Sequence, residues 1–317
     1  MKNPKTILLL CVVSIAGILL SCNQEKKSNT AVNTENNSST EYKPPQVPSN
    51  LTSKEEQLNY LFNHYWDNFN FSDTAKIIDS EYAEQAFVNY LAIFPAVSPS
   101  QLKEGITDFL DQAKQEQKGF DFFKKKLDSY LYDPNSPMRS DLFYEPVLEY
   151  YTSSDKVSAD EKTRYRILLD LARKNKVGST ATDFIYQTKE KAINKLHDLE
   201  NPLILLMFYE PGCSNCEQVI GVLKEQESIN QMIANKHMQI LAIYPEGNLE
   251  IWNDYAANIP SNWINGVDER QEVLNKGLYD LKASPTIYLL DKDKKVILKD
   301  TDLNALGNYL ASQGLSH

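Results

Sequence analysis

The sequence predicts two folded domains of different class: an all-α helical domain over residues 51–175 and an α/β domain over residues 176–317. A length of 317 residues fits two domains, since one domain typically takes about 100–200 residues. In the first region, apolar residues recur every three or four positions, as on one face of a helix. In the second, continuous apolar runs of strand length alternate with helical segments, a pattern typical of a buried sheet.

Six helices are predicted in the first region. The first begins at Ser53, where Glu56 completes the pattern of a capping box, and the sixth begins in the same way at Ser158 with Glu161. Short loops join the six helices, which predicts a small helical domain. The apolar positions that define the first five helices run over 58–69, 82–94, 102–113, 120–130 and 142–151.

The second region contains three predicted strands, and the last of them continues into a hairpin. The strands cover 202–209, 238–244 and 286–290, and the hairpin partner is 296–298. Helical spacing returns between them at 219–223 and 252–256, and again in a last helix over 303–310. This order predicts a central mixed sheet flanked by helices.

The N-terminus has the features of a secretory signal. Lys2 and Lys5 precede the apolar run Ile7–Leu20, which is shorter than the roughly 20 residues that a membrane-spanning helix needs. The run ends in Leu19-Leu20-Ser21-Cys22, which resembles the lipobox of bacterial lipoproteins. The resemblance implies a signal peptide over residues 1–21, cleavage before Cys22, and acylation of Cys22 as a membrane anchor. An ordinary cleaved signal or a short membrane anchor is the alternative.

Residues 22–50 are predicted to be a disordered tether, because this segment is polar, with Tyr42 as its single aromatic residue. Asn23 follows the predicted acylated cysteine, where an Asp would retain a lipoprotein in the inner membrane, so Asn23 favours the outer membrane. We therefore expect a cell-envelope protein that is lipid-anchored and faces the periplasm. The net charge of −10 argues against nucleic acid as a partner.

Two of the four cysteines, Cys213 and Cys216, form a C-x-x-C pair just after the first predicted strand. Cys213 would lie at a helix N-terminus, where unpaired N–H groups favour a thiolate, and Cys216 would lie one turn further on. This spacing suits a two-step exchange, with a nucleophile followed by a resolving thiol. A zinc half-site and a static disulfide are the alternatives. Zinc requires about four ligands, and the sequence has no second cysteine pair and no paired histidines.

The surrounding residues then resemble a known family. The segment 208–216, Phe-Tyr-Glu-Pro-Gly-Cys-Ser-Asn-Cys, resembles the active-site segment of the thioredoxin superfamily, and Ala283-Ser284-Pro285-Thr286 resembles its cis-proline loop. Their order and interval suit membrane-anchored reductases of the TlpA and ResA type. The resemblance implies a thioredoxin-like thiol–disulfide oxidoreductase without a cofactor or metal, in which Cys213 and Cys216 are catalytic and Ser284 and Pro285 contact the substrate.

Three positions depart from the family pattern. Gly212 replaces the usual Trp before the first cysteine, Asn215 replaces a common Pro, and Met207 replaces the buried acid of thioredoxins. Without that acid, Glu210 or water would have to accept the proton of the resolving thiol, although Glu210 also fits a solvated loop charge. These changes leave the redox potential open.

The helical region is similar to a domain of unknown function that precedes thioredoxin-like domains in bacterial lipoproteins. The aromatic residues of 65–69 and the turn 132–137 carry this likeness; they suit a binding face or, more simply, core packing and a turn.

The sequence thus predicts an enzyme that reduces or isomerises disulfides in exported proteins, with electrons from a membrane thiol donor. The main alternative is a non-catalytic partner-binding lipoprotein whose C-x-x-C forms a structural disulfide. A peroxiredoxin is disfavoured because Glu210 stands where that family has Thr. A copper chaperone is disfavoured because its usual C-x-x-x-C spacing is absent.

Overall fold

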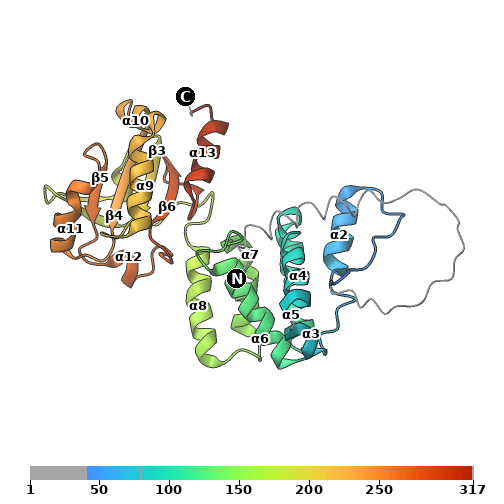
Figure 1. Cartoon of the computed structure of the whole chain (residues 1–317). Helices are drawn as coiled ribbons and strands as arrows, with labels where there is room; N and C mark the ends of the chain where they lie inside the picture. The colour runs from blue at the N-terminus through green and yellow to red at the C-terminus, as the bar shows by residue number, and fades with distance from the viewer. Residues whose placement is uncertain (1–40, 79, 316–317) are drawn as a thin grey trace, which may run out of the picture. The chain divides into compact units, whose positions relative to one another are not determined.

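The computed structural model of the chain describes residues 41–78 and 80–315. They form two compact units, one helical and one α/β, which divide between Tyr165 and Arg166 inside helix α8 (Figure 1). The predicted fold class is confirmed. The predicted domain boundary at 175/176 lies just after the end of α8. The predicted signal peptide, Cys22 and the tether up to residue 40 lie outside the described residues.

The helical unit contains the six predicted helices and an additional short one, α3. Their bounds are α2 Lys54–His64, α3 Thr74–Ile78, α4 Ser80–Leu91, α5 Pro99–Ala113, α6 Gln117–Leu127, α7 Asp141–Ser153 and α8 Ala159–Arg173. The capping box at Ser53 is present, with Glu56 N–H donating to the Ser53 hydroxyl at 3.2 Å. In the described part of the chain, no helix combines the length and apolar character that crossing a bilayer requires.

The core of the helical unit is an aromatic cluster around Trp66. Its indole ring stacks on Phe109 with ring centroids 4.8 Å apart, and it meets Phe69 and Phe123 edge-on. The prediction that the first helix extends to residue 69 is wrong, because α2 ends at His64. Residues 64–69 form turns closed by hydrogen bonds between positions three apart, and Tyr65, Trp66 and Phe69 remain buried. Their burial confirms core packing as the role of these aromatics.

The predicted tether is wrong at its C-terminal end, because Tyr42 is buried with only 5% of its surface exposed. Its ring stacks on Trp66 at 5.9 Å and meets Phe69 edge-on at 5.4 Å. Its hydroxyl donates a hydrogen bond to the carbonyl oxygen of Tyr65. The stretch around Tyr42 is therefore packed on the helical unit.

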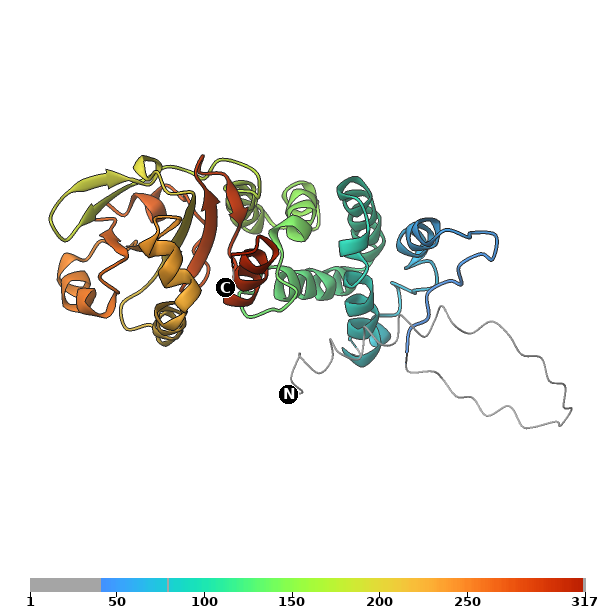
Figure 2. The same ribbon diagram turned by 90° about the horizontal axis from the view of Figure 1, so that it is seen from above.

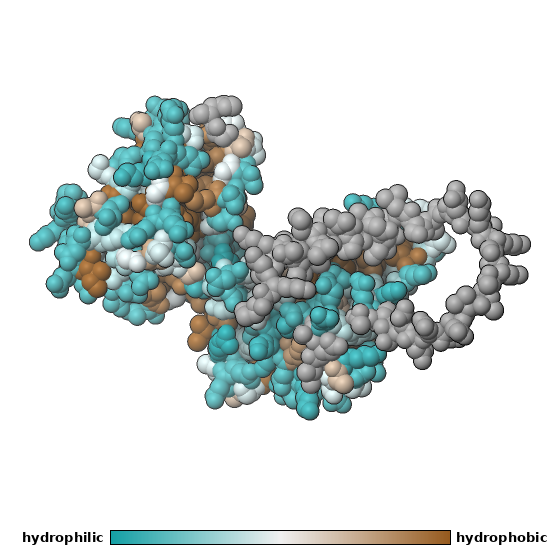
Figure 3. All heavy atoms as spheres, viewed as in Figure 1, coloured by the Kyte–Doolittle hydropathy of each residue, from teal (hydrophilic) through white to brown (hydrophobic). Residues whose placement is uncertain are grey.

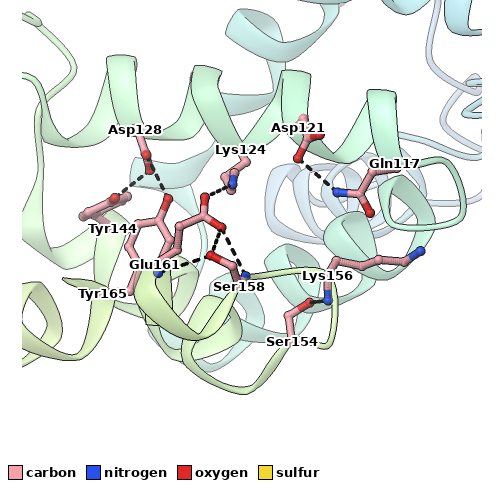
Figure 4. A network of polar contacts seen from close by, with 10 residues as sticks. All are labelled: Gln117, Asp121, Lys124, Asp128, Tyr144, Ser154, Lys156, Ser158, Glu161 and Tyr165. Carbon is pink, nitrogen blue, oxygen red and sulfur yellow. Dashed lines mark hydrogen bonds and ion pairs between the residues drawn. The ribbon is translucent and has the colours of Figure 1, made fainter. Parts of the chain in front are cut away.

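A polar network lies between α6, α7 and α8 (Figure 4). At its centre, the Asp128 carboxylate accepts hydrogen bonds from the hydroxyls of Tyr144 at 2.6 Å and Tyr165 at 3.1 Å. Desolvation raises the pKa of Asp128, although both hydroxyls oppose the shift. Nearby, Glu161 accepts a hydrogen bond from Lys124, which links α8 to α6.

The C-terminal unit is built on a seven-stranded mixed sheet in the order β2-β1-β5-β4-β3-β6-β7. The central strand β3 pairs in parallel with β4 and antiparallel with β6. The strand bounds are β1 Ile185–Thr188, β2 Ile193–Lys195, β3 Leu203–Phe208, β4 Met238–Tyr244, β5 Ile264–Val267, β6 Thr286–Asp291 and β7 Val296–Leu298. The three predicted strands and the hairpin are present, whereas the shorter β1, β2 and β5 are additional.

Successive side chains of β3 pack into two separate cores, one on each face of the sheet, as a doubly buried strand requires. Leu205 and Met207 face the core beneath α9, α10, α11 and α13, whereas Ile204 and Leu206 face the opposite core. The helices on the first face can be followed in Figure 2, and their bounds are α9 Ser214–Glu225, α10 Glu227–Ala234, α11 Leu249–Tyr255 and α13 Leu303–Ser312. The short helix α12 is Glu272–Asn275.

Candidate functional site

The C-x-x-C pair lies where β3 ends and α9 begins. Tyr209 still donates its N–H to the carbonyl of Ile243 at 3.0 Å, and the chain then turns through Glu210-Pro211-Gly212. Gly212 has a φ of +80°, a backbone conformation that side-chain-bearing residues rarely adopt. The turn brings Cys213 to the N-cap of α9, as the sequence predicts.

Cys213 uses its sulfur as the cap of α9. The backbone N–H of Cys216 donates to Cys213 Sγ at 3.3 Å, so one of the unpaired amides at the helix start is directed at this sulfur. Cys213 is partly exposed. This sulfur therefore combines access from solvent with a hydrogen bond that favours negative charge on it.

Cys216 is the third residue of helix α9 and is fully buried. Its pKa is raised to about 12, first by desolvation and then by the hydrogen bond and the charge of Cys213, with Glu210 adding a smaller repulsion. Both cysteines are free thiols in this structure. One thiol is thus accessible, and the other is held protonated beside it.

The loop that carries Pro285 faces the accessible sulfur. Cys213 Sγ lies 3.6 Å from the carbonyl oxygen of Ser284, with geometry for an S–H···O contact. The Ser284–Pro285 peptide bond is cis, as the resemblance implies. The Thr286 hydroxyl donates to the Ala283 carbonyl at 2.6 Å and closes the turn into β6. The structure therefore places Cys213, Cys216, Ser284 and Pro285 at one site.

Beneath the cysteines lies a polar contact that the sequence analysis missed. The Tyr209 hydroxyl and the Trp252 indole N–H both donate to Asn265 Oδ1, each at 2.9 Å. The ring of Tyr255 packs 5.9 Å from that of Tyr209. Desolvation, and then the negative charge of Glu217, raise the pKa of Tyr255. Asn265 lies on the short strand β5, which no apolar pattern marks.

Comparison with known proteins gives two family matches. Residues 21–175 match a domain of unknown function (DUF5106), and residues 201–296 match a thioredoxin-like domain. The crystal structure of a thioredoxin-like protein from Bacteroides caccae is 39% identical, with a TM-score of 0.80. The similarity covers 86% of this chain and 98% of that one. The chain belongs to this thioredoxin-like family.

The chain described here also resembles a curated enzyme. It is 30% identical over 123 residues to thiol-disulfide oxidoreductase ResA of Geobacillus thermodenitrificans. The aligned segment is 38% of this chain and spans 66% of the length of that relative. The chain is therefore homologous to a thiol–disulfide oxidoreductase.

The structure accounts for two departures of this thioredoxin-like protein from the usual motif. The left-handed backbone of Gly212 disfavours the Trp that many members have there. Met207, which replaces the buried acid, is fully buried and packs in the same apolar core as Cys216. Glu210 is exposed, in agreement with a solvated loop charge. Within residues 41–78 and 80–315, no three His, Cys, Asp or Glu side chains gather in a group that could hold a metal ion.

Proposed function

We propose that this protein is a membrane-anchored, extracytoplasmic thiol–disulfide oxidoreductase that reduces or isomerises protein disulfides through Cys213 and Cys216. The observation that carries the proposal is the double contact of Cys213 Sγ: it caps helix α9 at 3.3 Å and lies 3.6 Å from the Ser284 carbonyl. A nucleophilic sulfur is thereby held next to the loop that would pair with an incoming polypeptide.

In the first step, the Cys213 thiolate attacks one sulfur of the substrate disulfide. A bond forms between Cys213 and that sulfur, the substrate S–S bond breaks, and the other substrate sulfur leaves as a thiolate. Cys216 does not compete in this step, because burial and its raised pKa keep it protonated. The order of attack therefore follows from the difference in access between the two thiols.

In the second step, Cys216 attacks Cys213 Sγ and releases the second substrate thiol. Two of the causes that raise the pKa of Cys216 are the hydrogen bond and the charge of Cys213. Both involve the Cys213 thiolate, which is consumed when the mixed disulfide forms, so deprotonation of Cys216 becomes easier at that point. The departing substrate thiolate or water can accept the proton, since Met207 offers no base.

The cycle leaves a Cys213–Cys216 disulfide and two substrate thiols, so two electrons have been transferred. A membrane dithiol donor would return the enzyme to its reduced form by the same exchange chemistry. Anchoring through acylated Cys22 would keep the protein near such a donor, on the periplasmic side of the cell envelope. Asn23, the residue after Cys22, favours the outer membrane as the site of anchoring. For a solely isomerising cycle, the attack by Cys216 would be replaced by attack of another substrate thiol.

The proposal is tested by the reduction of insulin with dithiothreitol as electron donor. Wild-type protein should accelerate precipitation of the insulin B chain, and Cys213→Ser should abolish the acceleration. Ser214→Ala is a matched control, because Ser214 lies in the same motif and carries no sulfur. If Cys213→Ser kept full activity, the proposal would be wrong. The protein would then be better described as a partner-binding protein with a non-catalytic C-x-x-C pair.

A further inference from the structure

We infer that Lys282 is a positioning residue for the substrate-docking loop, held in place by a buried pair of aspartates. The inference rests on the proposed function and deepens it. The Pro285 loop, defined as residues 280–285, joins the segment after α12 to β6, and it carries Ser284 to the side of Cys213. Lys282 is two residues before Ser284 in this loop.

The Lys282 side chain is only 4% exposed, which is unusual for a lysine. Its ammonium lies 3.0 Å from Asp280 Oδ2 and 3.8 Å from Asp300 Oδ2. The two aspartate side chains are themselves 8% and 12% exposed. An ammonium is taken out of water only where fixed negative charges replace its hydration, so these contacts restrict where Lys282 can lie.

Asp280 and Asp300 hold Lys282 from two different parts of the fold. Asp280 belongs to the start of the same loop, directly after Tyr279, whose hydroxyl donates to the Thr182 carbonyl at 2.6 Å. Asp300 follows β7, and the next residue, Thr301, donates its N–H to the Ile287 carbonyl at 2.9 Å. Lys282 therefore links two positions within the Pro285 loop, and it also links this loop to the segment that follows β7.

The segment with Asp300 is anchored in turn to the end of α8. Lys299 Nζ donates to the carbonyls of Ala172 at 2.9 Å and Lys174 at 2.8 Å, which are among the free carbonyls at the C-terminus of the helix. A series of polar contacts thus runs from the end of α8 through Lys299 and Asp300 to Lys282. It ends in the loop whose Ser284 carbonyl faces Cys213.

This placement predicts a role that depends on the substrate. A polypeptide disulfide must align its backbone with the Pro285 loop, and loss of a docking contact that forms before the chemical step raises KM more than it lowers kcat. A small disulfide needs only the Cys213 sulfur. Loss of the Lys282 contacts should therefore impair the reduction of polypeptides and spare that of small disulfides.

The test compares Lys282→Met with wild type on two substrates, insulin and 5,5′-dithiobis(2-nitrobenzoic acid). We expect the KM for insulin to rise about tenfold or more with kcat changed less, whereas turnover of the small disulfide stays within about twofold. Lys282→Arg, which keeps the charge, should recover most of the insulin activity. Lys276→Met is the matched control, because the Lys276 ion pair with Glu272 is exposed and lies outside the loop.

Equal losses on both substrates, or wild-type kinetics with insulin, would overturn the inference. Should Lys282→Met fail to fold, Asp300→Asn serves instead, because it retains the lysine and its 3.0 Å contact with Asp280 and removes the negative charge that lies 3.8 Å from it. It should raise the KM for insulin about threefold, and an unchanged KM would overturn the inference in the same way. A wild-type protein that cannot reduce insulin would instead refute the proposed function itself.

Discussion

Asp128 in the helical unit is a partly buried acid and Cys216 in the C-terminal unit is a fully buried one, and desolvation is the main cause that raises the pKa of each. Their neighbours differ. Asp128 accepts hydrogen bonds from the hydroxyls of Tyr144 and Tyr165, so its polar partners lie inside the unit (Figure 4). Cys216 lies beside Cys213, which is partly exposed and faces the Pro285 loop.

The comparison shows that a shifted pKa does not by itself mark a reactive site. Such shifts arise in structural networks as well as in active sites. What differs here is the access to the partner groups, because Tyr144 and Tyr165 are buried whereas Cys213 is partly exposed. Hydrophobic side chains also reach the surface on the face of the C-terminal unit that carries α9, where Val222 is 51% exposed (Figure 3). We therefore assign chemistry to the cysteine pair and a structural role to Asp128.

The largest expected effect concerns the pH dependence of the second step. Desolvation, the largest cause of the raised pKa of Cys216, persists in the mixed disulfide, so only a small fraction of Cys216 is thiolate at neutral pH, and this fraction increases as the pH rises. The rate at which Cys216 resolves a preformed mixed disulfide should therefore rise about tenfold per pH unit above pH 7. Stopped-flow kinetics would measure it, and a flat profile would mean that the thiol is already ionised in the mixed disulfide.

The next effect tests whether Asp128 is only structural. Tyr144→Phe removes one hydroxyl donor from the partly buried carboxylate of Asp128 and should destabilise the helical unit by about 1–3 kcal/mol. Hydrogen exchange in α6 and α7 would report the loss, with Tyr60→Phe as control, because no hydrogen bond of that hydroxyl is found among the described residues. Insulin reduction per folded molecule should stay unchanged, and a parallel loss of activity would show that Asp128 acts on the redox site.

The smallest effect concerns the turn before Cys213. Gly212 and Gly221 both have open space where a Cβ would be added, but only Gly212 has a positive φ. Gly212→Ala should therefore cost about 1–2 kcal/mol, whereas Gly221→Ala, inside α9, should stabilise by about 0.5–1 kcal/mol. Thermal unfolding of the two variants would measure the difference. The same sign for both would show that the left-handed turn is not needed.

The elements that sequence reasoning found are those with a strong local signal. The apolar runs of β3, β4 and β6 were predicted, and β4 matches its predicted range of 238–244. Strands β1, β2 and β5 were missed, because three or four partly polar residues give no period to detect. They are strands because they continue a sheet that has already formed around β3 and β4.

The residues of the candidate site also fall into those with a local sequence signal and those without one. The cysteines and the Ser284-Pro285 loop follow from two local motifs. Lys282 could not be found, since a loop lysine next to aspartates ordinarily indicates a solvated surface. Its burial depends on Asp300, which is distant in sequence. Tyr42 was misjudged for a related reason, because its packing partners, such as Trp66, Phe69 and Tyr82, lie further along the chain.

The most direct test of the account is to identify which cysteine forms the mixed disulfide. Cys216→Ser and Cys213→Ser variants would be incubated with a polypeptide disulfide, and the adducts would be measured by intact mass and located by peptide mapping. We predict a stable adduct on Cys213 in the Cys216→Ser variant and none in the Cys213→Ser variant. An adduct that forms equally well on Cys216 would contradict the assignment of Cys213 as the accessible nucleophile and Cys216 as the buried resolving thiol.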